Sequence, residues 1–535
     1  MANQFSVIAK NGMVASSQPL ATLAGVQILM NGGNAIDAAI ATAAVLGVVE
    51  PSSIGIGGDA FCLFYSVREN AIKALDASGR SPYAASFEFC RKSGFKEMPQ
   101  RGIHSVTVPG AVHGWATLLN AYGKKTLGDV LQSAIRYAEE GFPVAELTAH
   151  SWHESESNLK ADEGASINYL VNGRTPRAGE IFKNPHMGKT LRRIADGGTE
   201  VFYQGEIAGK IVRCSERLGG LFSIKDFADH RSDWVEPITI NYRDYDVYEM
   251  PPATQGFVAI EMLKILEGFD LKSMGRGSPE LWHTMVEAKK LAYEDRARYI
   301  ADPAFAKVPV EGLLAKDYAR ARARLIDPAR AAARYEAGQP ALNRGDTTYI
   351  AVADGDGNMV SLIQSNYFGF GSGYVVDGFA IQNRGSAFDL EPGRPNSLLP
   401  GKRPFHTIIP AFAMRDGKPW LAFGLMGGDM QAQGHAQVIV NLVDFGMNLQ
   451  EAGDAARFYH TDSSEPNGTV MARGGVLHLE HGVSEEVRRE LVKRGHRVAD
   501  AVGLYGGYEA VARDPVTGVL SGATESRKDG CAMGY

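Results

Sequence analysis

A pair of threonines at the start of a strand-like run is the feature of this sequence best suited to covalent chemistry. Asp346 is followed by Thr347 and Thr348, and then by the apolar and β-branched run 349–353. If the chain were cut after Asp346, Thr347 would carry a hydroxyl nucleophile and, in its new α-amine, a base of near-neutral pKa. The same residues also suit a Gly-Asp turn that enters an edge strand, so the local sequence leaves both interpretations open.

The elements around these threonines predict stacked sheets flanked by helices. Asn34 is suited to cap a small apolar helix over 35–49, and three glycines at 55, 57 and 58 favour close backbone packing over a phosphate cradle. The hydrophobic periodicity predicts further helices over 22–30, 280–300 and 433–445, and strands over 60–65, 347–353, 359–364, 374–381, 408–414 and 420–423.

The segment that leads to the threonines has a different character. Residues 306–346 contain five arginines among alanines and then a stretch of glycine, proline and asparagine without apolar period. This pattern predicts a solvated helix followed by an exposed tether. Such a tether, ending at Gly345-Asp346, is a place where a chain could be cut.

Composition excludes several function classes. The 535 residues are 44% hydrophobic and 22% charged, with a net charge of -6, which argues against binding nucleic acid or an anionic membrane. No signal-like segment opens the chain, and the longest apolar run, 35–49, is too short to span a bilayer, so we expect a cytoplasmic location. Four scattered cysteines and the motif HSWHE at 150–154 fit no metal-ligand pattern, so neither a metal nor a cofactor is expected.

Several motifs resemble one family in order along nearly the whole chain. They are GVQILMNGGNAIDAAIATAAVLGVVEPSSIGIGGDAF, VTVPGAVHGW, PPATQG, HTMVEAKKLAYEDRARYIADP, GDTTYIAVADGDGNMVSL, FGSG, GKRP, GGD and a final Gly-Tyr. Together they make the chain similar to the γ-glutamyltransferase family of N-terminal-nucleophile hydrolases.

The resemblance implies an αββα four-layer sandwich of the α/β class, made as a proenzyme. A heavy segment 1–346 and a light segment 347–535 would stay together as one composite domain after cleavage between Asp346 and Thr347. Thr347 would then attack the substrate amide to give an acyl-enzyme, with Thr348 helping to orient it. Backbone N–H groups of Gly427 and Gly428 would form the oxyanion hole. Ser365 matches a family threonine that lies near the nucleophile's amine.

The positions that bind the substrate's far end depart from the family. The family's asparagine, glutamine and aspartate that hold an α-ammonium correspond here to Tyr367, Arg384 and Ala387. Two serines that bind the α-carboxylate become His406 and Thr407, and Arg80 lies near the family's carboxylate-binding arginine. A guanidinium at position 384 would repel an ammonium and grip a carboxylate.

These departures favour a carboxylate-bearing amide without a neighbouring ammonium. The segments NRGSAF and RPFHT resemble those of oxamate amidohydrolase-like members, so oxamate is the preferred small-molecule substrate. Three alternatives stay open: a γ-glutamyl hydrolase or transferase, an acylase for glutaryl side chains of β-lactam compounds, and an uncleaved non-enzymatic scaffold. Arg384 could instead pair with a surface carboxylate, His406 could be structural, and assembly into a homo-oligomer is undecided.

Overall fold

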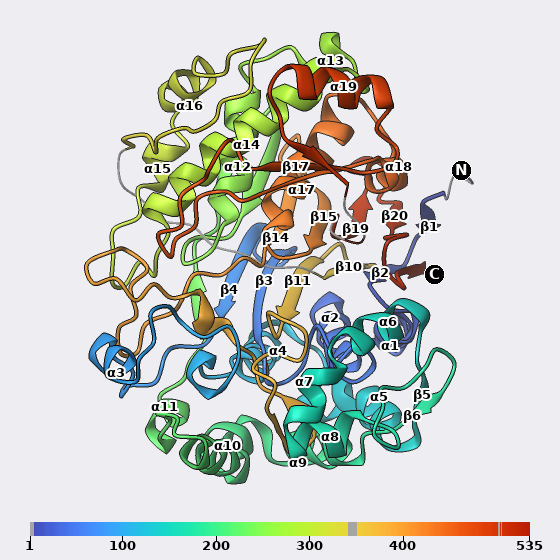
Figure 1. Cartoon of the computed structure of the whole chain (residues 1–535). Helices are drawn as coiled ribbons and strands as arrows, with labels where there is room; N and C mark the ends of the chain where they lie inside the picture. Colours follow the sequence, from blue (N-terminus) through green and yellow to red (C-terminus); the bar gives the residue numbers. More distant parts are fainter. Residues whose placement is uncertain (1–4, 341–349, 501–502, 504) are drawn as a thin grey trace.

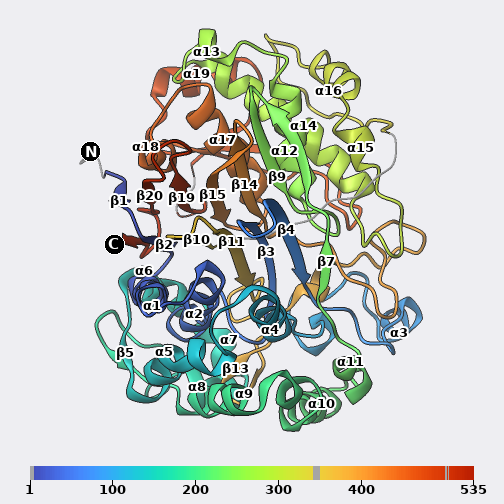
Figure 2. The same ribbon diagram turned by 180° about the vertical axis from the view of Figure 1, so that it is seen from behind.

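Two sheets lie face to face, with helices packed on both outer faces, in a computed structural model that describes residues 5–340, 350–500, 503 and 505–535. Figures 1 and 2 show the resulting four layers, with the strands in the middle and helices at either side. The predicted αββα sandwich is therefore confirmed.

Each of the two sheets has seven antiparallel strands. Sheet A has the order β1 (Val7–Ala9), β20 (Leu520–Ala523), β19 (Gly507–Arg513), β15 (Lys418–Met426), β14 (Pro410–Arg415), β9 (Tyr245–Glu249), β8 (Ile238–Tyr242). Sheet B has the order β21 (Cys531–Gly534), β2 (Gly12–Ser16), β10 (Ala351–Asp354), β11 (Met359–Ser365), β3 (Asp59–Ser66), β4 (Ala71–Ala77), β7 (Asp233–Val235). Both sheets thus combine strands from the beginning and the end of the chain.

The helices form the two outer layers. Sheet B is covered by a layer that includes α1 (Pro19–Met30), α2 (Ala35–Val49), α4 (Ala111–Tyr122), α5 (Leu127–Glu140), α9 (Pro185–Tyr203) and α10 (Glu206–Arg217). Sheet A is covered by α12 (Gly256–Leu266), α14 (Pro279–Tyr299) and α17 (Met430–Val443), with α18 (Leu449–Asp454) and α19 (Glu485–Lys493) beside them.

Shorter elements complete the chain. The helices are α3 (Phe87–Lys92), α6 (Glu146–Glu154), α7 (Glu156–Ala161), α8 (Glu163–Tyr169), α11 (Ile224–Ala228), α13 (Leu271–Met274), α15 (Val310–Leu313) and α16 (Lys316–Ala323), with the 3-10 turns η1 (Ile103–Ser105) and η2 (Arg384–Ala387). The small sheets use β5 (Phe142–Pro143) with β6 (Ile181–Phe182), β12 (Val375–Val376) with β13 (Phe379–Ala380), and β16 (Phe458–Thr461), β17 (Val476–Leu479) and β18 (Val498–Ala499).

Strand β3 shows why the sandwich closes. All of its residues are buried, because Phe61 and Leu63 face the other sheet while Cys62 and Phe64 face the helices over sheet B. A side-chain period of two is what a strand covered on both faces requires. The glycines before β3 allow close packing, since a Cβ on Gly58 would lie 2.5 Å from the Ser365 carbonyl oxygen. The prediction of close backbone packing is confirmed.

Helix boundaries agree with the sequence prediction where capping signals are strong. Asn34 caps α2 through a reciprocal pair of hydrogen bonds with Asp37, and all fifteen residues of the helix are buried. The strand predicted over 374–381 was wrong as a single element. It is a small hairpin of β12 and β13, because Asp377 and Gly378 both adopt positive φ and form a two-residue turn.

The segment expected as a tether, 306–346, is described up to residue 340. It contains α15 and α16, and beyond them its backbone is held by buried carboxylates of α14. Glu287 accepts from the Ala332 N–H at 3.1 Å, and Asp295 accepts from the Gly338 N–H at 2.6 Å. No described helix is both long and apolar enough to cross a bilayer.

Candidate active site

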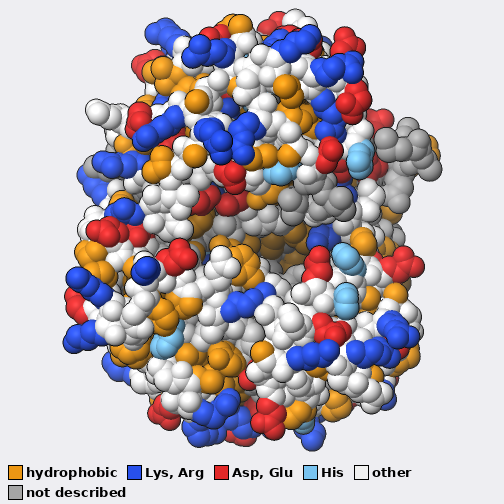
Figure 3. Space-filling view, in the orientation of Figure 1, with side chains coloured by type: hydrophobic (Ala, Val, Ile, Leu, Met, Phe, Trp, Pro, Cys, Tyr) orange, Lys and Arg blue, Asp and Glu red, His pale blue; other side chains and the backbone are white. Residues whose placement is uncertain are grey.

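Asp346, Thr347 and Thr348 lie outside the described residues, so the site is built here from what surrounds them. Strand β10, which the chain enters immediately after them, lies in the middle of sheet B between β2 and β11. Figure 3 shows a hollow near the middle of one face, with acidic and hydrophobic side chains on its walls. The other candidate residues come from β11, η2, the loop before β14 and the turn after β15.

Gly427 and Gly428 form the turn that joins β15 to α17. Both have positive φ, 118° and 59°, a conformation that favours glycine. A Cβ on Gly427 would also lie 3.2 Å from the Cα of Gly506. Because the turn opens a helix, its N–H groups lie at the positive end of the α17 dipole. This geometry suits an oxyanion hole.

Two buried side chains hold this turn in place. Gln255, from the PPATQG motif, donates to the Gly428 carbonyl at 3.1 Å and to the Thr407 carbonyl, so it joins the turn to the RPFHT segment. Arg296 of α14 pairs with Asp429, the residue after the two glycines, and donates to Gln255 at 2.9 Å. The turn is therefore held from the heavy segment.

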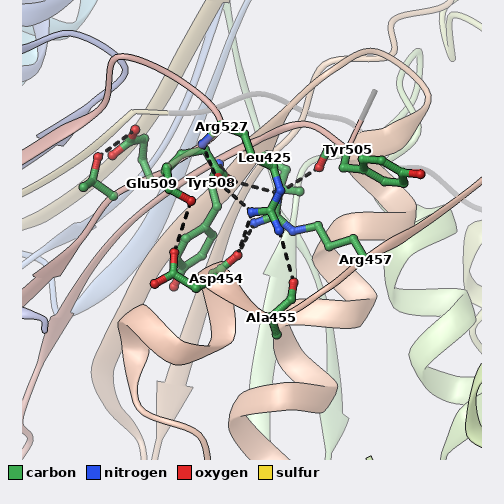
Figure 4. Close-up of polar contacts among 12 residues, drawn as sticks. Leu425, Asp454, Ala455, Arg457, Tyr505, Tyr508, Glu509 and Arg527 are labelled. Carbon is green, nitrogen blue, oxygen red and sulfur yellow. Dashed lines mark hydrogen bonds and ion pairs between the residues drawn. The ribbon is translucent and has the colours of Figure 1, made fainter. Parts of the chain in front are cut away.

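The opposite side of the turn is supported by a buried ion cluster shown in Figure 4. Arg457 donates to the Tyr505 carbonyl at 2.8 Å and pairs with Glu525, which Arg527 also contacts. Tyr505 precedes Gly506, whose backbone packs against Gly427. The cluster thus fixes the segment against which the glycine turn lies.

Arg384 is the most informative charged residue of the site. Its side chain is 0% exposed, and among the described residues its only hydrogen-bond partner is the Thr407 hydroxyl at 3.2 Å. Its Nε and Nη2 have no partner in the part of the chain that the structure describes. Burial lowers the pKa of the guanidinium, yet arginine stays charged at neutral pH. Buried charges are normally paired, so this group needs an anion.

His406 and Thr407 lie next to Arg384. Both ring nitrogens of His406 are buried without a described partner, and the ring contacts Phe61 edge-on at 5.1 Å between centroids. Burial and two nearby guanidinium groups hold the pKa of His406 well below its usual range, so the imidazole is neutral. A neutral imidazole can still donate one hydrogen bond to an anion.

Tyr367 fixes the plane of the Arg384 guanidinium. The guanidinium carbon lies 4.1 Å from the centre of the Tyr367 ring. Tyr367 has a φ of 77°, which is uncommon for a bulky residue, and the Ser365 hydroxyl accepts from its N–H at 2.8 Å. Ser365 therefore supports the loop that carries the stacking ring. Its predicted position near the amine of Thr347 stays a prediction.

Arg80 is already paired. It contacts Asp233 at 2.6 Å and donates to the Arg231 carbonyl at 3.2 Å, and Asp233 is shared with Arg403. A substrate contact by Arg80 stays a prediction that would require this pair to open. The structure thus brings together Arg384, His406, Thr407 and the glycine turn.

Sequence reasoning assigned no role to Gln255, Arg296, Asp429 or Asp59. All four lie in motifs that carry the family resemblance, namely PPATQG, AYEDRARYI, GGD and GIGGDAF. Their place in these motifs was the sequence signal that could have identified them.

One further cluster has the composition of a metal site. The ligand atoms of His283, Glu287 and His496 lie within 4.8 Å of one another. The two imidazoles are hydrogen-bonded to each other at 2.8 Å, and Glu287 pairs with Lys290 at 2.7 Å. Since these groups already bond to one another and to Lys290, we interpret the cluster as a structural hydrogen-bond network beneath the 327–338 segment.

The chain matches a known protein family and resembles several of its members. The family model described as gamma-glutamyltranspeptidase matches residues 21–535. The chain is 39% identical to the glutathione hydrolase-like YwrD proenzyme of Bacillus subtilis, over 99% of both chains. It is 34% identical to the oxamate amidohydrolase proenzyme of Klebsiella pneumoniae, again over 99% of both.

A solved structure agrees across the whole fold. The cephalosporin acylase from Bacillus halodurans superposes with a TM-score of 0.93 at 43% identity, covering 100% of this chain and 98% of that one. The protein is therefore an N-terminal-nucleophile enzyme, and the chain belongs to the γ-glutamyltranspeptidase family.

Proposed function

We propose that the protein is a self-processing amidohydrolase for a small carboxylate-bearing amide, with oxamate as the preferred substrate. The relatives carry glutathione hydrolase-like, acylase and oxamate amidohydrolase names, and the oxamate relative is less similar than the first of these and than the solved acylase. The names therefore do not choose the substrate, and the proposal depends on the chemistry of the pocket.

The observation that carries the proposal is the unpaired guanidinium of Arg384. A carboxylate could accept from its Nε and Nη2 in a fork, which is the strongest arrangement that this side chain offers. The neutral His406 and the Thr407 hydroxyl lie beside it. Ala387 stands where a family aspartate would attract an ammonium, so the light segment offers that cation no acidic partner there.

The proposed mechanism follows the fold. Thr347, freed by cleavage after Asp346, attacks the amide carbon, and its own amine accepts the hydroxyl proton. The oxyanion forms against the N–H groups of Gly427 and Gly428. The amine proton passes to the leaving nitrogen, ammonia departs in the case of oxamate, and water hydrolyses the oxalyl ester. The heavy segment 1–346 and light segment 347–535 remain packed, because both sheets mix strands from the two.

The test combines intact mass with ammonia release. Purified protein should give two masses that correspond to a break between Asp346 and Thr347, and it should release ammonia from oxamate but not from oxamide, which lacks the carboxylate. Thr347→Ala should give one uncut, inactive chain. Equal rates on oxamate and oxamide would overturn the anionic substrate, and a processed Thr347→Ala chain would overturn the nucleophile.

A further inference from the structure

Asp59 is a buried carboxylate at the first position of β3, opposite Ser365 in the sheet. Its side chain is 0% exposed. One oxygen accepts from the Gly79 N–H at 2.8 Å, while Oδ2 has no partner in the part of the chain that the structure describes. A buried acceptor without a donor is costly, so such an atom calls for an explanation.

Asp59 lies on the face of β3 that is turned toward Arg384 and His406. It shares one face of β3 with Phe61, because they are two residues apart, and Phe61 contacts the His406 ring. Arg384 is the charged group with the largest effect on the ionisation of Asp59. Even so, the free nitrogens of Arg384 and the free oxygen of Asp59 do not bond to one another. The Arg384 guanidinium, which can donate, and the Asp59 carboxylate, which can accept, thus lie near each other without a bond between them. We call them the donor pole and the acceptor pole.

A second buried acceptor without a described partner lies near the start of β3. Asn366 is 1% exposed, and its Oδ1 also has no described partner. This oxygen lies beside Gly58, the residue before Asp59, where an added Cβ would be 2.9 Å from it. Because neighbouring residues of an extended strand point to opposite faces of its sheet, a position beside Gly58 does not place this oxygen with the Asp59 side chain, and the acceptor is Asp59 Oδ2 alone.

We propose that Asp59 is a second substrate-binding residue, whose free oxygen accepts an N–H of the substrate molecule whose carboxylate occupies Arg384. The inference rests on the proposed function and narrows its substrate class. It requires a carboxylate with a neutral N–H donor on the neighbouring carbon, as in an α-amido acid. Oxamate meets this requirement through its amide NH2, and a glutaryl group does not.

A purely structural role for Asp59 makes a different prediction. If the carboxylate served only to hold the Gly79 backbone, its loss would weaken every ligand alike. Asp76 is the matched control, because it is equally buried but fully engaged, accepting from the Ser78 N–H at 2.8 Å and pairing with Arg403 at 3.4 Å. Replacing either aspartate by asparagine removes one buried charge at nearly constant volume.

The probes are oxamate and pyruvate, which differ by an amide NH2 in place of a methyl group. Binding to the purified, processed enzyme is measured from the rise of Tm over a concentration series. We expect the wild type to bind oxamate at least ~10-fold more tightly than pyruvate, since a site built for an N–H donor rejects the analogue that lacks it. Asp59→Asn should reduce this ratio to about 1, because its one acceptor oxygen stays with the Gly79 N–H and its NH2 then faces the ligand, whereas Asp76→Asn should keep the ratio.

The outcomes separate this inference from the proposed function. A wild-type ratio near 1, or an unchanged ratio in Asp59→Asn, overturns the role of Asp59 while the anion pocket stands. If neither probe raises Tm, the anion pocket itself is wrong and the role of Asp59 falls with it. Should Asp59→Asn fail to fold, the wild-type ratio alone still decides, because the acceptor pole predicts a preference for oxamate.

Discussion

Two buried guanidinium groups in this protein have opposite surroundings. Arg457 lies behind the glycine turn, where it pairs with Glu525 at 2.8 Å and donates to the carbonyls of Tyr505 and Gly453. Arg384 lies at the candidate site and has one hydroxyl partner among the described residues. Burial is complete in both cases, so burial alone does not distinguish a structural arginine from one that awaits a ligand.

The neighbouring carboxyl groups show the same contrast. Burial pushes the pKa of Glu525 up, but Arg457 and Arg527 in direct contact hold it below its usual value. Burial raises the pKa of Asp59 to about 7, because Arg384 acts on it only from a distance. A completed ion pair overcomes desolvation, whereas an incomplete one does not. The incomplete region is the one in which buried polar atoms have no described partner.

The largest expected effect is on stability, at the completed cluster. Arg457→Met leaves two buried carbonyl groups without this donor and Glu525 with one of its two arginines, which should cost about 3–5 kcal/mol of unfolding free energy. Arg384→Met removes a charge that has no ionic partner, so its stability should match or exceed that of the wild type. Urea unfolding of both variants checks this, and an equal loss in the two would erase the distinction between the regions.

The second expected effect is on activity, where the substitution of Arg384 should cause the loss. Arg384→Gln should lower kcat/KM for an anionic amide by ~100-fold, since it removes a buried charge-assisted fork. Arg384→Lys keeps the charge without the fork and should recover only part of the loss. Initial rates of ammonia release from oxamate measure both. Unchanged kinetics in Arg384→Gln would remove the residue from the site.

The sequence predicted the parts of this comparison that depend on local pattern. The layers, the boundaries of α2 and the glycine turn follow from periodicity, capping and motif. Arg384 was singled out because its residue type reverses the charge expected at that position. Its lack of a partner could not be predicted, since that depends on how η2, β3 and the loop before β14 meet across the sandwich.

Asp59 is a second residue with a side-chain atom whose lack of a described partner could not be predicted from the sequence. In the sequence it is one residue of GIGGDAF, and nothing local tells whether its carboxylate is paired. Its free oxygen becomes visible only when the strand register places it opposite Ser365 and on the same face as Phe61. Arg80 shows the reverse, because its type suggested a ligand while the fold gave it Asp233.

A smaller effect should distinguish the contribution of the Tyr367 ring to substrate binding from that of its hydroxyl. Tyr367→Ala removes the ring that lies against the Arg384 guanidinium and should raise KM for oxamate by ~30-fold with little change in kcat, in line with a desolvated cation–π contact of about 2 kcal/mol. Tyr367→Phe keeps the ring and should behave like the wild type. A loss of kcat rather than KM in the alanine variant would place Tyr367 in the chemical step instead.

The smallest effect is a pH dependence that only the incomplete region should show. Below pH 7 Asp59 is mostly protonated and neutral, and above it the carboxylate repels a ligand carboxylate on Arg384. Pyruvate, which has no N–H to offer, should therefore bind several-fold more weakly as pH rises through about 7.

The neighbouring groups should not produce the same dependence. His406 stays neutral across this range because its pKa is well below its usual value, and Arg384 and Arg403 stay charged. Asp59→Asn should make pyruvate binding independent of pH, while Asp76→Asn should keep the dependence with its midpoint moved to lower pH, because the charge of Asp76 raises the pKa of Asp59. If the wild-type affinity does not change between pH 6 and 8, Asp59 does not sense the anion at Arg384, and the two poles of the pocket would have to be occupied independently.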